Sequence, residues 1–149
     1  SKDYEGEDLL LVGVLKGGFV FLADLCREIT IPVSIDFISV SSYGNSTVSS
    51  GVVRILKDID YDITGKHILI VEDLIDTGLT LTYLKDLFAA KHCASVKLCT
   101  ILDKPSKRKV PLEIDYKGIE IPDEFVIGYG LDYAEKYRNL PDVCVMAEK

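Results

Sequence analysis

Runs of consecutive apolar residues constrain the fold of this chain more than any other feature. Residues 9–14 read LLLVGV and residues 67–71 read HILIV, without the alternation of polar and apolar positions that marks a half-exposed strand. A strand of a parallel sheet is covered on both faces, so it is apolar almost throughout. We therefore expect both runs to be buried strands of a parallel sheet.

Helical patterns lie between the expected strands. Residues 19–29 and 79–90 carry apolar residues at intervals of three and four, the spacing of a helix with one buried face. Further strands are expected at 33–40, which is rich in β-branched residues, and at 96–102. The expected buried faces are Phe19, Leu22, Ala23, Cys26 and Ile29 in the first helix and Leu81, Leu84, Leu87 and Phe88 in the second.

This alternation of strands and helices predicts an α/β fold, with a mainly parallel twisted sheet flanked by helices. We expect a single domain over residues 1–149, a length that allows a sizeable core. The polar stretch 41–51 is expected to be a long loop, and 52–56 a returning strand that completes a hairpin. The remaining expected elements are a turn at 62–66, a basic loop at 104–109, and short strands at 125–127 and 143–146.

Charge and cysteine content exclude several classes of protein. A formal net charge of -7 argues against a protein that binds nucleic acid by neutralising phosphates. No apolar run approaches the roughly 20 residues of a membrane helix, and the polar, mostly acidic first residues do not resemble a signal peptide, so we expect a cytoplasmic protein. The cysteines form no CxxC pair, so no zinc site is expected. We expect reduced, mostly buried thiols at Cys26, Cys93, Cys99 and Cys144.

Carboxylates and hydroxyls follow the apolar run at 67–71. Ligands of an open parallel sheet bind outside the carboxyl ends of its strands, and the N-terminus of the following helix offers free N–H groups to an anion. The stretch therefore suits a sugar phosphate: the turn would bind the phosphate, and the carboxylates would bind hydroxyls, or a metal through water. Its polar residues are Glu72, Asp73, Asp76, Thr77 and Thr80, with Gly78 in the turn.

A simpler interpretation is that Asp76 or Thr77 caps the following helix. Capping accounts for one of these residues but not for the neighbouring pair Glu72 and Asp73. The stretch is neither a Walker A loop nor a dinucleotide-binding fingerprint, because the sequence contains neither GxxxxGK[ST] nor GxGxxG.

The stretch VEDLIDTGLTL resembles the phosphoribosyl-pyrophosphate motif of the purine phosphoribosyltransferases. Other segments resemble the hypoxanthine-guanine members of that family in particular, in the family's order over nearly the whole chain: VLKGGFVFLADL, SSYGNSTVSSG, LDKPSKR and PDEFVIGYGLDYAEKYRNLP. The resemblance implies the type I phosphoribosyltransferase fold. It also implies magnesium-dependent transfer of a 5-phosphoribosyl group from phosphoribosyl pyrophosphate to N9 of hypoxanthine or guanine, in purine salvage.

The resemblance also implies roles for individual residues. Asp76 would be the catalytic acid/base at the purine N7, and Glu72 and Asp73 would hold the ribose hydroxyls. Asp132 would bind magnesium partly through water, with Glu72 and Asp73 as further candidate ligands. A non-proline cis peptide is implied at the pyrophosphate loop, Lys16-Gly17. The other implied roles are 5-phosphate binding by Thr77, Gly78, Leu79 and Thr80, pyrophosphate binding by Lys16, Gly17 and Arg138, base binding by Lys104, Phe125 and Val126, and a mobile lid over about 41–51 that includes Ser42 and Tyr43.

The sequence departs from the family at two places. Leu79 stands where some relatives carry lysine, so the phosphate site would have one charge fewer, and the family's N-terminal segment is expected to be missing. We expect a base-binding region over about 103–149 and a homodimer or homotetramer. The alternatives are a phosphoribosyltransferase for xanthine, adenine or a pyrimidine, and a regulatory protein that binds phosphoribosyl pyrophosphate without catalysis.

Overall fold

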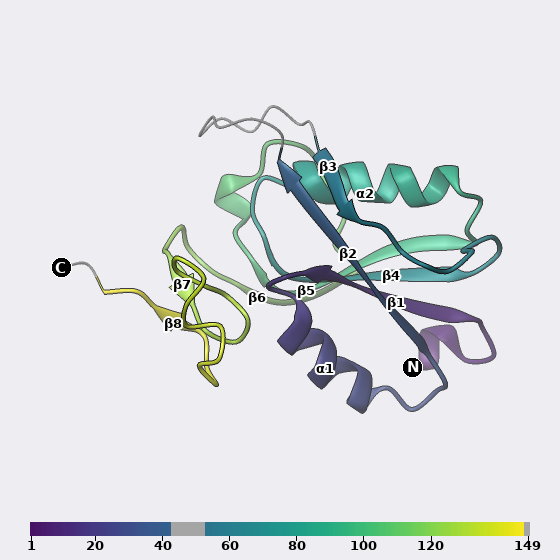
Figure 1. The fold of residues 1–149 in the computed structure, drawn as a ribbon, viewed down its shortest axis with the longest axis horizontal. Coiled ribbons are helices and arrows are strands. Elements are labelled where there is room, and N and C mark those ends of the chain that lie inside the picture. Colours follow the sequence, from purple (N-terminus) through teal and green to yellow (C-terminus); the bar gives the residue numbers. More distant parts are fainter. Residues whose placement is uncertain (43–52, 148–149) are drawn as a thin grey trace.

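A six-stranded sheet forms the centre of the computed structural model, which describes residues 1–42 and 53–147 (Figure 1). The strand order is β3-β2-β1-β4-β5-β6. All neighbouring strands are parallel except β2 and β3, which form the expected antiparallel hairpin. The strands are β1 (Leu9–Leu15), β2 (Ser34–Ser42), β3 (Val53–Lys57), β4 (His67–Ile75), β5 (Ser95–Asp103) and β6 (Tyr116–Glu120).

Two helices cover opposite faces of this sheet (Figure 1). Helix α1 (Phe19–Glu28) connects β1 to β2, and helix α2 (Leu79–Ala90) connects β4 to β5. Parallel crossovers are right-handed, and β2 and β5 lie on opposite sides of the central pair β1 and β4. The two helices therefore fall on opposite faces, which confirms the predicted α/β architecture.

Apolar side chains form one core layer on each face of the sheet. On one face Leu84 and Phe88 of α2 are fully buried against Ile68 and Ile70 of β4. On the other, Leu22 of α1 packs with a cluster that comprises Tyr4, Leu9, Leu11, Leu69, Val71 and Cys99. Successive residues of β4 thus enter alternate layers, as the continuous apolar run predicts.

The helix faces differ in part from the sequence prediction. In α2 the expected residues Leu81, Leu84 and Phe88 are buried, and Leu87 is partly buried. In α1 the expected Phe19 is 42% exposed and Ala23 is exposed as well, so the assignment of these two residues to the core was wrong. Phe19 is the first residue of α1 and follows directly after the turn at Lys16 to Gly18, at the rim of the sheet.

Several short elements complete the chain. The edge strand β6 was not predicted from the sequence, and neither were the 3₁₀ turns at Lys2–Tyr4 and Pro105–Lys107. Strands β7 (Val126–Ile127) and β8 (Cys144–Val145) form a separate antiparallel pair within the predicted late strands. This pair lies beyond the carboxyl ends of the central strands (Figure 1).

The cysteines are free thiols in different environments. Cys99 is buried, Cys26 and Cys93 are partly exposed, and Cys144 is exposed, so the expectation of mostly buried thiols was wrong. Cys144 lies in β8, whose two residues are exposed, although those of its partner strand β7 are buried. In the part of the chain that the structure describes, neither α-helix has the length and apolarity needed to cross a membrane.

Candidate active site

The order of the strands reverses at the central parallel pair, β1 and β4. The connection after β1 leads towards β2 on one side, and the connection after β4 leads towards β5 on the other. In open α/β sheets the crevice at such a point, outside the carboxyl ends of the strands, is where ligands bind. Residues 16–18 follow β1 and residues 76–78 follow β4, so segments far apart in the sequence meet there.

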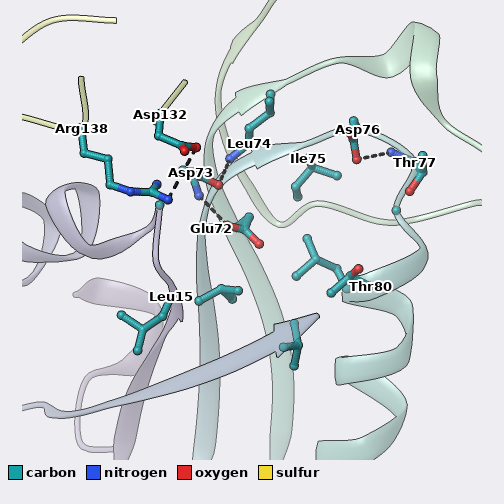
Figure 2. Close-up of a pocket in the computed structure, with 15 residues that line it drawn as sticks. Leu15, Glu72, Asp73, Leu74, Ile75, Asp76, Thr77, Thr80, Asp132 and Arg138 are labelled. Atoms are coloured by element: carbon teal, nitrogen blue, oxygen red, sulfur yellow. Dashed lines mark hydrogen bonds and ion pairs between the residues drawn. The ribbon is translucent and has the colours of Figure 1, made fainter. Parts of the chain in front are cut away.

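A cavity of about 330 Å³ occupies this crevice (Figure 2). Residues from five parts of the chain line it: the end of β1 with the turn after it, β2, the end of β4 with the turn after it, the start of α2, and the C-terminal region. Its polar lining includes Glu72, Asp73, Asp76, Thr77, Thr80, Asp132 and Arg138.

Glu72 and Asp73 lie within β4 rather than after it. The sequence predicted a strand end at residue 71, but pairing with β5 continues from Glu72 opposite Thr100 to Ile75 opposite Asp103. The Asp73 N–H donates to Glu72 Oε1 at 3.0 Å, and the Leu74 N–H donates to Asp73 Oδ1 at 2.7 Å. Burial, together with the adjacent Asp73 carboxyl, holds the pKa of the Glu72 carboxyl well above its usual range.

The turn after β4 carries one exposed carboxylate and leads into a helix. The side chain of Asp76 is exposed, and its Oδ1 accepts the Thr77 N–H at 2.6 Å. Gly78 has a φ of +82° and is the N-cap of α2, so no side chain occupies the N-cap position. The interpretation of Asp76 as the helix cap is therefore wrong. Thr77 makes one long contact with the helix, in which the Leu79 N–H donates to Thr77 Oγ1 at 3.4 Å.

The turn after β1 approaches the acidic pair closely. The peptide bond between Leu15 and Lys16 is cis, next to the Lys16-Gly17 loop for which the resemblance implied such a bond. Gly17 lines the cavity beside Asp73. Two elements that the sequence separates by more than fifty residues therefore share one wall of the site.

Asp132 and Arg138 reach the same cavity from the C-terminal region (Figure 2). Arg138 Nη1 donates to the Gly130 carbonyl at 2.8 Å, and Nη2 lies 3.5 Å from Asp132 Oδ1. The second Asp132 oxygen, Oδ2, accepts the Glu135 N–H at 2.8 Å. The guanidinium is thus oriented by a carbonyl and a carboxylate before any ligand binds.

A second cavity, of about 530 Å³, adjoins the first. Lys104, Phe125 and Val126 line it, and the two cavities share Leu74, Asp76 and Asp132, which form their common rim.

Lys104 is the buried cation of this second cavity. Lys104 is 8% exposed, its N–H donates to the Ile75 carbonyl at 2.9 Å, and its Nζ lies 3.9 Å from Asp123 Oδ1. Phe125 is more than half exposed and packs edge-to-face with Tyr133, with ring centroids 5.9 Å apart. A flat aromatic face and a buried ammonium therefore line one cavity.

Comparison with known proteins shows the family to which this chain belongs. The model described as "Phosphoribosyl transferase domain" matches residues 1–134. A hypoxanthine-guanine phosphoribosyltransferase of Bacillus subtilis is 53% identical over 146 residues, which are 98% of this chain and 81% of that protein. The chain belongs to the phosphoribosyltransferase family, on its hypoxanthine-guanine branch.

Solved structures of phosphoribosyltransferases agree with this assignment. A hypoxanthine phosphoribosyltransferase of Staphylococcus aureus superimposes with a TM-score of 0.95 at 47% identity, covering 98% of this chain and 79% of that one. A hypoxanthine-guanine phosphoribosyltransferase of Bacillus anthracis gives a TM-score of 0.94 at 56% identity, covering 98% and 86%. The predicted type I phosphoribosyltransferase fold is confirmed.

Most residues singled out in the sequence of this phosphoribosyltransferase line one of the two cavities. Lys16 and Leu79 line neither, although Gly17 and Gly78 beside them line the first. Tyr43 and the side chain of Ser42 lie outside the described residues, so the expected lid is not described.

Sequence reasoning missed Asp123 and Lys107, which line the second cavity, and Glu135. Asp123 stands two residues before Phe125 in the PDEF segment, which was the available signal.

Proposed function

We propose that this protein transfers the 5-phosphoribosyl group of phosphoribosyl pyrophosphate to N9 of hypoxanthine or guanine. The products would be IMP or GMP and pyrophosphate. The observation that carries the proposal is the position of Asp76, on the shared rim of an acidic, hydroxyl-lined cavity and a cavity with a buried lysine and an exposed phenylalanine. A sugar phosphate and a purine bound in these two cavities would meet at Asp76.

The first cavity suits the phosphoribosyl group. Glu72 and Asp73 would bind the ribose hydroxyls, and their charge would favour the positive ring of an oxocarbenium-like transition state. Thr77, Gly78, Leu79 and Thr80 would bind the 5-phosphate, largely through backbone N–H groups at the start of α2. Because Leu79 offers no charged side chain, this site depends on backbone donors and hydroxyls.

Lys16, Gly17 and Arg138 would bind the pyrophosphate. A guanidinium suits a diphosphate because it can donate two parallel hydrogen bonds. The C1′–O bond to pyrophosphate breaks as the C1′–N9 bond forms, so negative charge grows on the departing group. Cations at this end of the cavity would stabilise that charge.

Magnesium fits the first cavity as an ion carried by the substrate. Asp73 and Asp132 offer carboxylate oxygens on its wall, which are suitable ligands. Among the described residues, no group of three or more Asp, Glu, His or Cys side chains could hold a metal, so water and phosphate oxygens would supply most ligands. When bound, the ion would neutralise charge on the departing pyrophosphate.

The second cavity suits a 6-oxopurine. The Lys104 ammonium would donate to the exocyclic oxygen, Phe125 would stack on the ring, and the Val126 backbone would meet its polar edge. As N9 attacks, the purine must lose a proton, and Asp76 would accept it from N7. Each named group therefore has one task that its chemistry allows.

The wider setting extends the same proposal. We place the enzyme in the cytoplasm, in purine salvage, and as a homodimer or homotetramer. Ser42 and Tyr43 would belong to a lid that covers the substrates during the reaction.

Direct assay of the activity tests the proposal. The purified protein would be mixed with magnesium, phosphoribosyl pyrophosphate and one base at a time, and nucleotide would be measured by chromatography. We expect IMP and GMP from hypoxanthine and guanine, and little AMP from adenine. Equal turnover of adenine would overturn the base assignment, and binding of phosphoribosyl pyrophosphate without nucleotide formation from any base would favour the regulatory alternative.

A further inference from the structure

One carboxylate contacts both of the cations assigned to pyrophosphate. Glu135 Oε2 lies 3.0 Å from Lys16 Nζ, and Glu135 Oε1 lies 3.3 Å from Arg138 Nη2. Lys16 follows β1, whereas Glu135 and Arg138 lie in the C-terminal region, 119 residues further along in the case of Glu135. The carboxylate therefore connects two parts of the chain that both border the first cavity.

The backbone around Glu135 is held in an unusual conformation. Ala134, Glu135 and Tyr137 have φ values of +52°, +65° and +78°, which residues other than glycine rarely adopt. Such conformations persist where the surroundings impose them, and they cluster at functional sites. Here the Glu135 N–H donates to Asp132 Oδ2 at 2.8 Å. The Asp132 carboxylate therefore helps to fix the turn that places Glu135 beside Lys16 and Arg138.

The contacts of Glu135 are those of an anion between two cations. Each carboxylate oxygen contacts a different cation. The hydrogen bond from the Lys16 ammonium is the main reason that the pKa of the Glu135 carboxyl lies below its usual range. An oxyanion of pyrophosphate bound to Lys16 and Arg138 would compete for the same donors. It would also repel a carboxylate at this distance.

We propose that Glu135 is a built-in substitute for pyrophosphate, pairing with Lys16 and Arg138 in the free enzyme and giving them up when the diphosphate group binds. The inference rests on the proposed function, which assigns Lys16 and Arg138 to pyrophosphate. Exchange of one anion for another keeps both cations paired in each state. It also weakens the net binding of pyrophosphate, so the product leaves faster.

The binding of magnesium pyrophosphate measures this competition directly. Isothermal titration calorimetry would compare the parent with Glu135→Gln, which keeps the shape of the side chain and removes its charge. Lys16 and Glu135 are exposed and Arg138 is only partly buried, so each ion pair is weak. We expect Glu135→Gln to bind about three- to tenfold more tightly. Stopped-flow dissociation should be slower by a similar factor, and at saturating substrates kcat should fall if release limits turnover.

Glu120→Gln is the matched control. Glu120 is exposed to a similar degree and pairs with Lys117 on β6, and neither residue lines either cavity. This variant changes the net charge equally and should bind pyrophosphate like the parent. Asparagine tolerates positive φ, so Glu135→Asn provides a second neutral variant that should also bind more tightly, even if Glu135→Gln proves unstable.

The outcomes separate the two proposals. A parent that binds pyrophosphate while both folded Glu135 variants bind it equally or more weakly would overturn the role of Glu135 and leave the proposed function standing. A parent and variants that all fail to bind magnesium pyrophosphate would overturn both. An equal gain in Glu120→Gln would attribute the effect to net charge and refute the specific role of Glu135.

Discussion

Gly17 packs directly against the carboxylate of Asp73. A β-carbon built on Gly17 would lie 1.8 Å from Asp73 Oδ2, a distance that no side chain tolerates, so one of the two must move. Gly17 belongs to the turn after β1 and Asp73 to β4, so the absence of a side chain at residue 17 allows this turn to approach the acidic pair.

The first prediction is that Gly17→Ala inactivates the enzyme without unfolding it. Displacement of Asp73 by about 1 Å should lower kcat/KM by about 100-fold, measured as nucleotide formation. Gly65→Ala is the control: unlike Gly17, Gly65 has a positive φ of +74°, but nothing lies within 4 Å of a β-carbon there. It should cost about 1 kcal/mol of stability and keep its activity. Full activity of Gly17→Ala would contradict the rigid contact.

The second prediction concerns Asp76, whose exposed side chain contributes little to packing. Asp76→Asn should keep the melting temperature of the parent and lower kcat by about 100- to 10,000-fold, the range for an acid/base residue. Asp86→Asn, an exposed position on α2 that lines neither cavity, should behave like the parent. A kcat for Asp76→Asn within about twofold of the parent would exclude the assigned role.

The third prediction concerns base choice. Lys104 is buried and donor-only, so it suits a 6-oxo group and opposes the amino group of adenine. We expect the parent to favour hypoxanthine over adenine by about 10,000-fold in kcat/KM. Lys104→Gln should reduce this ratio more than it weakens binding of phosphoribosyl pyrophosphate. Lys107→Gln, in the same cavity but half-exposed, should leave the ratio unchanged; equal losses in both variants would argue against a direct contact from Lys104.

The fourth prediction links Glu72 to the pH dependence of stability. The folded-state pKa of Glu72 is raised, so its protonation stabilises the fold at low pH, and this contribution is lost as the pH rises through the folded-state pKa. Glu72→Gln is neutral at every pH. Its free energy of unfolding in urea should therefore exceed the parent's at about pH 8, with the difference shrinking towards about pH 5. Glu113→Gln, an exposed control, should show no such trend. If the difference in unfolding free energy between Glu72→Gln and the parent does not change with pH, the raised pKa of Glu72 is refuted.

The fifth prediction distinguishes the thiols. Burial raises the pKa of Cys99 to about 11, whereas Cys144 is exposed. Because the thiolate is the reactive form, iodoacetamide at neutral pH should label Cys144 well before Cys99, as measured by peptide mass spectrometry. In urea both should react at similar rates; early labelling of Cys99 in the folded protein would show that its layer of the core opens readily.

The strands and helices of the central βαβ units could be predicted because buried elements leave apolar residues at regular positions in the local sequence. The apolar run at 67–71 and the stripe of α2 each follow from local spacing. Strand β6 could not be predicted, since the edge sequence YKGIE is mostly exposed and carries no apolar pattern. The extension of β4 to Ile75 depends on backbone pairing with β5, which the acidic side chains of Glu72 and Asp73 do not reveal.

The candidate site could also be predicted only in part, because the sequence shows contacts within one segment and not contacts between distant segments. Residues within one motif, such as Asp76 and Thr77, were found together because a single turn presents them. The resemblance supplied Lys104 and Arg138. The contacts of Glu135 with Lys16 and of Asp123 with Lys104 join segments that are separate in the sequence, and no local spacing encodes such a pair.

The shared rim of the two cavities has a practical consequence for protein engineering. Leu74, Asp76 and Asp132 line both, whereas Lys104, Phe125 and Val126 line the second cavity alone. A library that varies only the latter three would sample new nucleobase analogues while the sugar-phosphate half stays constant. The fold is in this sense modular, and a redesigned variant would remain compatible with the same activated ribose donor.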